Sequence, residues 1–277
     1  MEYFTGKFAF ITGGTSGIGY ALAEKLVQQG CHVAILARHA EMLESAVISL
    51  VKLRINEQQN IIPIQADVVK RDELNSKLEE FITQYGIPDI VINCAGVAHP
   101  GTFSALKPEI FDWMMDVNYF GTVNVLKNFV SAMQKRRSGT IVNISSIAGF
   151  IGLYGYTAYG ASKFAVSGFS DALRSELKPY GIQVSVVFPP DTQTPQLEYE
   201  SQFKPFITKE LSSSTNLMSS EKVAEIILKQ VAQKKYIIIP GSEGKLLYFL
   251  HNLLGGKFYP LLDIIIRLAI KKIKFGT

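Results

Sequence analysis

The stretch that decides the fold is Thr12-Gly13-Gly14-Thr15-Ser16-Gly17-Ile18-Gly19, which joins an apolar run at residues 8–12 to a helical pattern at residues 18–29. Glycines permit a tight turn and let backbone N–H groups approach a pyrophosphate at the positive end of the helix dipole. A glycine-rich turn without a ligand is the alternative. The position of the stretch between the first strand and the helix that follows favours a dinucleotide-binding loop. We predict that its contacts with the cofactor come from Gly13, Thr15, Ser16, Gly17, Ile18 and Gly19.

Short apolar runs alternate with longer helical patterns along the rest of the chain. Strands are predicted at residues 8–12, 32–37, 61–66, 90–95, 140–145, 183–188 and 236–240, and helices at residues 18–29, 40–54, 70–85, 108–136, 159–178 and 220–233. The strands are apolar nearly throughout, as expected where helices cover both faces of a parallel sheet. We therefore predict an α/β fold of the Rossmann type, a doubly wound parallel sheet of about seven strands with helices on both faces.

No internal repeat or domain boundary interrupts residues 1–244, so we predict a single nucleotide-binding catalytic domain over this range. Within it, residues 191–219 form a long stretch without a regular pattern, and connections of such length often serve as substrate lids. A disordered surface loop is the alternative. The aromatic side chains of Tyr199, Phe203 and Phe206 favour a lid that packs against the domain.

The chain has 277 residues and is 47% hydrophobic, which is enough for a sizeable core. Cys31 and Cys94 lie far apart, with no CxxC pair or His/Cys cluster, so we expect a reducing compartment and no metal. Residues 1–11 lack the charged, apolar and small-residue regions of a secretory signal. These features predict a cytoplasmic protein.

The net charge of +4 is concentrated at the end of the chain, where residues 257–277 hold five basic side chains against Asp263 alone. A nucleic-acid binder more often spreads Lys and Arg over a face or groove together with stacking aromatic side chains. We therefore expect no nucleic-acid partner.

Two apolar runs, residues 246–254 and 258–270, make up most of a C-terminal extension at residues 245–277. Neither run reaches the roughly 18 residues of a spanning helix, and Asp263 and Arg267 would be costly inside a bilayer. One interpretation is a helical hairpin buried in a subunit interface. The other is a pair of interfacial helices in peripheral contact with anionic head groups, favoured by the basic residues Lys271, Lys272 and Lys274. Either structure could line an entrance for a long acyl chain.

The second predicted strand ends Leu36-Ala37-Arg38, about 20 residues beyond the glycine-rich loop. An enzyme that prefers NAD places a carboxylate there for the ribose 2′-hydroxyl, whereas a 2′-phosphate requires positive charge. The guanidinium of Arg38 therefore predicts NADP(H) as the cofactor, with a further hydroxyl contact from Thr15. An ordinary surface cation is the alternative for Arg38.

Tyr159 and Lys163 lie four residues apart at the start of a predicted helix and therefore share one face of it. A nearby ammonium would lower the pKa of the phenol, which is otherwise too high for acid–base work at neutral pH. Tyr–Lys pairs at this spacing are common in ordinary helices. The spacing alone is therefore weak evidence for catalysis. It becomes stronger together with Ser145 and Ser146, which end the preceding strand, and with Asn118 in the helix before it.

The chain resembles the short-chain dehydrogenase/reductase family over nearly its whole length, through the glycine-rich loop, Asn93-Cys94-Ala95-Gly96, Asn118, Ser146, Tyr159 and Lys163. In that family the catalytic serine lies thirteen residues before the tyrosine, which selects Ser146 over Ser145. The resemblance implies that Ser146 binds the substrate carbonyl oxygen and that Tyr159 donates a proton to it. It also implies that Lys163 binds the nicotinamide ribose, while Asn118 holds a helix irregularity and a proton-passing water.

The resemblance implies further cofactor contacts, in addition to those of the glycine-rich loop, Arg38 and the catalytic pair. Asp67 would contact the adenine. The other further contacts are Val68, Asn93, Ala95, Gly96, Pro189, Thr192 and Thr194. Cys94 stands where the family usually has Asn, and Pro190 where it usually has Gly. Family members associate through the two helices that follow the fourth and fifth strands. A homodimer or homotetramer is therefore expected.

The segment at residues 189–195, Pro-Pro-Asp-Thr-Gln-Thr-Pro, is similar to a signature of one subgroup, the 3-ketodihydrosphingosine reductases. This similarity implies NADPH-dependent reduction of 3-ketosphinganine, a long-chain keto lipid, by a protein peripheral to the cytoplasmic face of a membrane, the endoplasmic reticulum in a eukaryote. The alternatives are enzymes of the same scaffold that act on 3-oxoacyl thioesters, steroids or retinol. A non-catalytic NADP(H) sensor would need the loop but not the set Asn118, Ser146, Tyr159 and Lys163.

Overall fold

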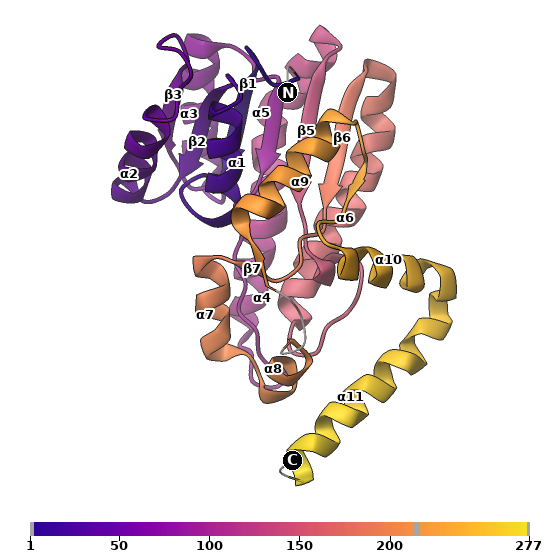
Figure 1. The fold of residues 1–277 in the computed structure, drawn as a ribbon. Coiled ribbons are helices and arrows are strands. Elements are labelled where there is room, and N and C mark those ends of the chain that lie inside the picture. The colour runs from indigo at the N-terminus through magenta and orange to yellow at the C-terminus, as the bar shows by residue number, and fades with distance from the viewer. Residues whose placement is uncertain (1–2, 213–216, 276–277) are drawn as a thin grey trace.

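A seven-stranded parallel sheet forms the centre of the protein, seen in a computed structural model that describes residues 3–212 and 217–275 (Figure 1). The strand order is β3-β2-β1-β4-β5-β6-β9. The bounds are β1 Phe8–Thr12, β2 His32–Ala37, β3 Ile61–Gln65, β4 Ile90–Asn93, β5 Gly139–Ile144, β6 Ile182–Val187 and β9 Ile237–Ile238. This confirms the predicted Rossmann-type sheet, although β9 has only two residues.

Two hydrophobic cores, one on each face of the sheet, explain why the strands are apolar throughout. On β1, Ile11 packs into the core with α1 and α9, while its neighbour Phe10 packs into the core with α3 and α5. Successive side chains of a strand point to opposite faces, so both sets must be apolar. The helices are α1 Gly17–Val27, α2 Ala40–Val51 and α9 Ser220–Ala232 on the first face, and α3 Arg71–Tyr85, α5 Gly121–Arg136 and α6 Thr157–Leu177 on the second.

The chain reverses direction along the sheet between β1 and β4, because β2 and β3 lie on one side of β1 and β4 on the other. Such a switch point leaves a crevice at the carboxyl ends of the strands, where ligands bind in open α/β sheets. Thr12 ends β1, and its hydroxyl oxygen accepts hydrogen bonds from the backbone N–H groups of Cys94 and Ala95, which follow β4, both at 3.0 Å. These bonds link the two strands at the switch point. The site is therefore held on a rigid edge.

The predicted helix at residues 108–136 contains an irregular turn. It consists of α4 Pro108–Met114, a π-helical turn at Met115–Phe120 that contains Asn118, and α5. A π turn inserts one extra residue into the helix and often marks a functional site. The helix irregularity that the family resemblance implied at Asn118 is present.

Residues 191–219 are not the irregular stretch that we predicted. They contain α7 Pro195–Phe203 and α8 Phe206–Ser212, and β7 Thr192–Gln193 pairs with β8 Met218–Ser219. Phe203 stacks on His99 with 4.4 Å between ring centroids, and the Tyr199 hydroxyl lies 2.8 Å from Nδ1 of His99. These two aromatic side chains pack as expected, whereas Phe206 is 61% exposed. Residues 213–216 lie outside the described residues.

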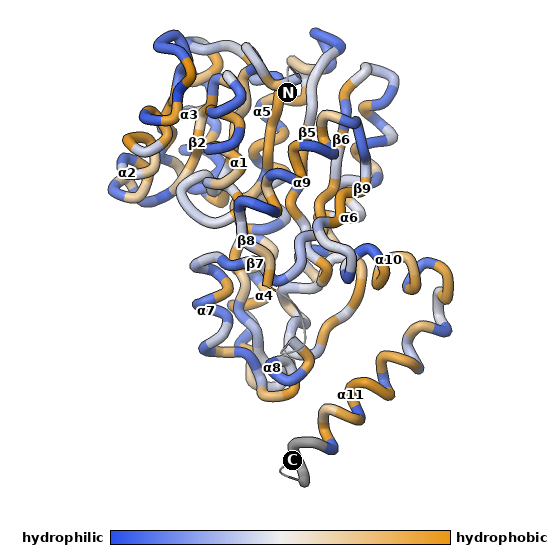
Figure 2. Tube along the Cα trace, viewed as in Figure 1, coloured by the Kyte–Doolittle hydropathy of each residue, from blue (hydrophilic) through white to orange (hydrophobic). Residues whose placement is uncertain are grey.

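The C-terminal extension forms α10 Ser242–Leu254, a 3-10 turn at Gly255–Lys257 and α11 Phe258–Phe275. Figure 1 shows α10 leaving the domain and α11 running back toward α8, and the tube in Figure 2 is mostly apolar along α11. Phe258 and Ala269 are buried, but Leu261, Ile264 and Leu268 are at least half exposed. Among the described residues, no helix is both long enough and apolar enough to cross a bilayer. The side chains of Lys272 and Lys274 lie outside the described residues.

Candidate active site

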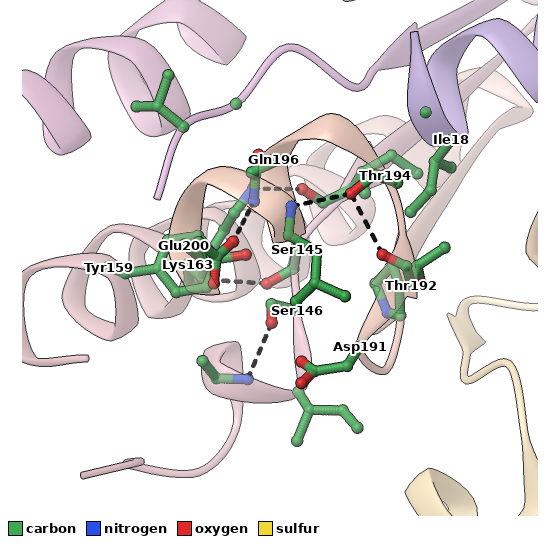
Figure 3. Close-up of a pocket in the computed structure, with 18 of the residues that line it drawn as sticks. Ile18, Ser145, Ser146, Tyr159, Lys163, Asp191, Thr192, Thr194, Gln196 and Glu200 are labelled. Carbon is green, nitrogen blue, oxygen red and sulfur yellow. Dashed lines mark hydrogen bonds between the residues drawn. The ribbon is translucent and has the colours of Figure 1, made fainter. Parts of the chain in front are cut away.

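A cavity of about 630 Å³ opens at the carboxyl edge of the sheet and extends from the β1–α1 loop to α11. Figure 3 shows its catalytic part in close-up. The cavity brings together every predicted catalytic or cofactor residue except Asn93 and Asn118, whose side chains lie behind its wall. Residues as far apart in the sequence as Gly13 and Thr194 therefore form one site.

The glycine-rich loop leaves room for an anion at the start of α1. Gly13 has φ +67°, and a Cβ there would lie 2.9 Å from Cα of Ala95. A Cβ on Gly19 would collide with the carbonyl oxygen of Gly13. The Ser16 side chain makes no cap hydrogen bond, and the first turn of α1 holds no acidic residue. The helix N-terminus thus keeps unsatisfied N–H groups and positive potential for a pyrophosphate.

The far end of the nucleotide site is lined by Arg38, Asp67 and Val68. Arg38 follows β2 and is exposed, and no ion pair to it occurs within the described part of the chain. Asp67 follows β3, and its carboxylate accepts a hydrogen bond from the backbone N–H of Val69 at 3.0 Å. A fixed carboxylate and an uncommitted guanidinium can therefore contact the base and a 2′-phosphate, respectively.

Asn93 is a predicted cofactor residue that does not line the cavity, and its contact with the cofactor stays a prediction. Its side chain is buried beneath the cavity and donates a hydrogen bond to Oδ1 of Asn143 at 2.8 Å. The next three residues, Cys94, Ala95 and Gly96, line the cavity instead. Asn93 ends a central strand, so its side chain points into a helix-covered face while the chain turns toward the ligand edge.

Asn118 sits behind Lys163, separated from it by Gly96. A Cβ on Gly96 would lie 3.2 Å from Oδ1 of Asn118 and 3.3 Å from Nζ of Lys163, so a larger residue would intrude on both. The Asn118 amide accepts from the Val97 N–H at 2.8 Å and donates to the Val97 carbonyl oxygen at 3.0 Å. These bonds anchor the π turn to the loop after β4. The proton-passing water stays a prediction.

The two serines after β5 differ in direction. The Ser145 hydroxyl is buried and donates to the carbonyl oxygen of Lys163 at 2.9 Å. The Ser146 hydroxyl accepts from the Ala148 N–H at 3.2 Å and interacts with the Tyr159 phenol. Ser146, which the thirteen-residue spacing selects, is therefore the serine placed to share a substrate oxygen with Tyr159.

Tyr159 and Lys163 lie together on the first turns of α6, with Nζ of Lys163 5.7 Å from the Tyr159 ring centroid. Burial lowers the pKa of Lys163 to about 8, and its Nζ donates to the carbonyl oxygen of Ile144 at 3.0 Å. The expected lowering of the Tyr159 pKa is not found. Burial, followed by the negative charge of Glu200, raises that pKa, although hydrogen bonds with Ser146 and Gln196 oppose the rise.

Thr192 and Thr194 line the cavity beside Pro189, as expected for the nicotinamide side. The Thr192 hydroxyl donates to the carbonyl oxygen of Pro190 at 2.8 Å, and the Thr194 hydroxyl accepts from the Leu197 N–H at 3.2 Å as the N-cap of α7. The methyl group of Thr194 would lie 2.9 Å from a Cβ on Gly17. The start of α7 is thereby packed against the cofactor loop.

A buried polar cluster on α7 was missed by sequence reasoning. Glu200 is only 6% exposed, and its carboxylate accepts from the Tyr156 hydroxyl at 2.8 Å and from Nε2 of Gln196 at 2.9 Å. Lys204, also buried, forms an ion pair with Asp191 at 3.2 Å. In the sequence these are charged residues of an apparently exposed segment, and no local signal marks them.

The opposite end of the cavity is apolar. Its wall comes from the loop after β5 and from three helices, α8, α10 and α11, through Leu153, Leu211, Leu247, Leu262, Ile265 and Ile266. The cavity therefore joins a polar nucleotide edge to an apolar wall built by the last third of the chain.

Comparison with known proteins agrees with this arrangement. A family model described as short chain dehydrogenase matches residues 7–204, which contain the sheet through β6, the glycine-rich loop and the Ser146, Tyr159 and Lys163 set. This chain belongs to the short-chain dehydrogenase family. In this short-chain dehydrogenase the matched region ends before α8, so the residues of the apolar wall, apart from Leu153, lie beyond it.

Relatives with curated functions share most of this chain. A 3-dehydrosphinganine reductase of Danio rerio is 37% identical over 87% of this chain and 73% of its own length. A 3-ketodihydrosphingosine reductase of Dictyostelium discoideum is 33% identical over 94% and 82%, respectively. Among solved short-chain dehydrogenase folds, ElxO with NADP bound has a TM-score of 0.74 and 28% identity, covering 84% of this chain and 96% of that one.

Proposed function

We propose that this protein reduces the ketone of 3-ketosphinganine to the alcohol of sphinganine, with NADPH as the hydride donor. The observation that carries the proposal is the single cavity that joins the Tyr159 site to an apolar wall from α8, α10 and α11. The curated relatives named above reduce the same ketone according to their names. A long-chain keto lipid has the matching chemistry, with a polar head at one end and an alkyl chain at the other.

NADPH supplies the hydride that reduces the carbonyl carbon. The N-terminus of α1 would hold its pyrophosphate, and Arg38 would hold its 2′-phosphate. As negative charge grows on the carbonyl oxygen, the hydroxyls of Ser146 and Tyr159 donate hydrogen bonds to it, and Tyr159 transfers its proton. The raised pKa keeps the Tyr159 phenol protonated until the substrate binds, but it also makes the proton harder to transfer, so the positive charge of Lys163 on the same face of α6 has to stabilise the phenolate that forms.

Lys163 replenishes the proton on Tyr159. Its pKa of about 8 lies close to physiological pH, so the ammonium can lose and regain a proton readily. In this mechanism Asn118, whose amide is hydrogen-bonded to the Val97 backbone behind Gly96, holds the water that connects Lys163 to solvent. Cys94, beside Lys163, does not compete, because burial raises the pKa of its thiol to about 12.

The substrate preference tests the proposed function directly. We expect NADPH oxidation to be at least about tenfold faster, in kcat/KM, with 3-ketosphinganine than with a short 3-oxoacyl thioester or a steroid ketone at matched concentrations. The apolar wall would add binding energy for the long chain at about 25 cal/mol per Å² buried. A higher kcat/KM for either other ketone would discard the substrate assignment and leave the mechanism intact.

We further propose that α10 and α11 bind a membrane surface peripherally. Leu246, Phe249 and Leu253 on α10 are more than half exposed, as are Ile264 and Leu268 on α11. Exposed apolar groups of this extent mark an interaction surface, and the basic residues at the chain end suit anionic head groups. A location at the cytoplasmic face of the membrane that holds the substrate follows from this contact.

The double variant Ile264→Asp/Leu268→Asp tests the membrane contact. Two carboxylates on the outward side of α11 should reduce the fraction of protein that floats with anionic liposomes by about tenfold, because charges are costly in the acyl region. The control variant Ile48→Asp/Ile55→Asp places the same charges on exposed apolar positions near α2 and should bind normally. Unchanged flotation, with a smaller oligomer by gel filtration, would instead place α11 in a subunit interface.

We also propose that the protein is a homodimer or homotetramer. Phe120, at the end of the π turn, and Phe164, on α6, are both more than 40% exposed. They lie on the helices that follow β4 and β5, through which the family associates. Burial of these two rings against a second subunit would account for their exposure in one chain.

A further inference from the structure

The buried carboxylate of Glu200 lacks a charged partner. Its two oxygens accept hydrogen bonds from Tyr156 and Gln196, both neutral donors. The nearby ammonium of Lys204 is already paired with Asp191 at 3.2 Å, and no ion pair to Glu200 occurs among the residues that the structure describes. Glutamates are almost never this buried unless they are paired. A carboxylate also has capacity for further donors beyond these two.

Glu200 lies in the catalytic part of the cavity rather than at its rim. It lines the cavity together with Tyr159 and Lys163, and Figure 3 draws its carboxylate beside them. Its negative charge acts on both groups: it adds to the rise that burial causes in the pKa of Tyr159, and it opposes the fall that burial causes in the pKa of Lys163. A cation that entered this part of the cavity would therefore meet Glu200 and the reacting carbonyl group at once.

Without a bound cation, the position of Glu200 is unfavourable for catalysis. A negative charge near Tyr159 opposes the transfer of its proton, since that step leaves a second negative charge on the phenolate. Burial also raises the pKa of the Glu200 carboxyl group itself, because its charged form loses hydration. A cation supplied by the substrate would remove both penalties. The arrangement thus makes sense for a ligand that carries a positive charge close to its ketone.

We infer that Glu200 binds a substrate ammonium group on the carbon next to the reacting ketone, and so selects 2-amino ketones over uncharged ketones. This inference rests on the proposed function and deepens it. In 3-ketosphinganine the amine sits on the carbon adjacent to the carbonyl group, so an oxygen held by Ser146 and Tyr159 brings the ammonium to the α7 side of the cavity. Thioester and steroid ketones carry no such group.

Lys204 and Asp191 have a supporting part in this assignment. Their ion pair neutralises Asp191, which also lines the cavity, so Asp191 does not compete with Glu200 for a cation. Tyr156 and Gln196 hold its carboxylate from two sides, so its direction is fixed before a substrate arrives. Fixed charges of this kind give specificity without the cost of reorganisation.

The test compares two ketones with the wild-type protein and with Glu200→Gln, which keeps the size of the side chain and removes its charge. The substrates are 3-ketosphinganine and its amine-free analogue with the same chain and terminal hydroxyl. The wild-type protein should prefer the amine in kcat/KM. In Glu200→Gln the ratio of the two kcat/KM values should fall by at least about 30-fold, the lower range for losing one partner of a buried charge pair.

Glu198→Gln is the matched control, because it makes the same charge change on the exposed side of α7 and should leave the ratio unchanged. Quenching of protein fluorescence by NADPH checks that each variant folds. An equal loss with both ketones would overturn the inference and leave Glu200 as a structural anchor of α7. An unchanged ratio would overturn it as well. A wild-type protein that reduces neither ketone would overturn the proposed function, and this inference with it.

Discussion

Replacing Tyr159 with Phe should lower kcat by about a thousandfold, within the range of 10² to 10⁴ that a positioned acid contributes. The substitution removes one oxygen and keeps the ring that packs among Tyr156, Ala148 and Met114. Ser146 would then face the carbonyl oxygen alone, and no proton would be available as charge develops there. The measurement is single-turnover NADPH oxidation with 3-ketosphinganine, together with NADPH binding by fluorescence.

The control for this prediction is Tyr180→Phe, at the end of the short helix after α6 and outside the cavity, which should be as active as the wild type. Binding of NADPH should be nearly the same in all three proteins, since the phenol oxygen adds little to cofactor affinity. Near-normal turnover by Tyr159→Phe with NADPH bound would refute the acid role and leave Ser146 as the sole oxygen ligand.

Replacing Arg38 with Asp should shift the preference for NADPH over NADH by about 100-fold toward NADH. A charge-assisted bond to the 2′-phosphate is lost, and a like charge takes its place. The new carboxylate could also accept from the ribose 2′-hydroxyl, as in enzymes that use NAD. The ratio of the two kcat/KM values is the quantity to measure, because a general loss of stability cancels in it.

Lys52→Asp provides a comparison of equal charge change at the end of α2, on an exposed residue that does not line the cavity. Its cofactor preference should match that of the wild type. If Arg38→Asp also kept the wild-type ratio, Arg38 would be an ordinary surface cation, and the NADP(H) preference would have to come from another group such as Thr15.

The sheet and its helices were predictable because their patterns are long and regular. The first six predicted strands begin or end within two residues of those observed, since a strand buried on both faces is a continuous apolar run. The order of the glycine-rich loop, Ser146 and Tyr159 along the chain identified the site, because parallel strands bring their carboxyl ends to one edge.

The parts that were missed depend on packing between distant residues. The helices α7 and α8 have nine and seven residues, too few for a clear period, and are stabilised by contacts such as that of Tyr199 with His99. Glu200 looks like any exposed helical glutamate until Tyr156, 44 residues away, is brought against it. Burial is the main cause of the raised pKa of Tyr159, and the charge of Glu200 adds to it, so a local Tyr–Lys spacing could not reveal the direction of that shift.

If the outward apolar side of α10 and α11 binds a membrane as proposed, it also decides which measure of substrate concentration sets the rate of the enzyme. An enzyme held at a bilayer by this side would search for a lipid in two dimensions, with the apolar wall of its cavity, which α11 helps to build, close to the lipid surface. Its rate would then follow the mole fraction of the ketone among the membrane lipids rather than its bulk concentration. Diluting the ketone with inert phospholipid at constant total amount would slow such an enzyme, whereas adding buffer would not.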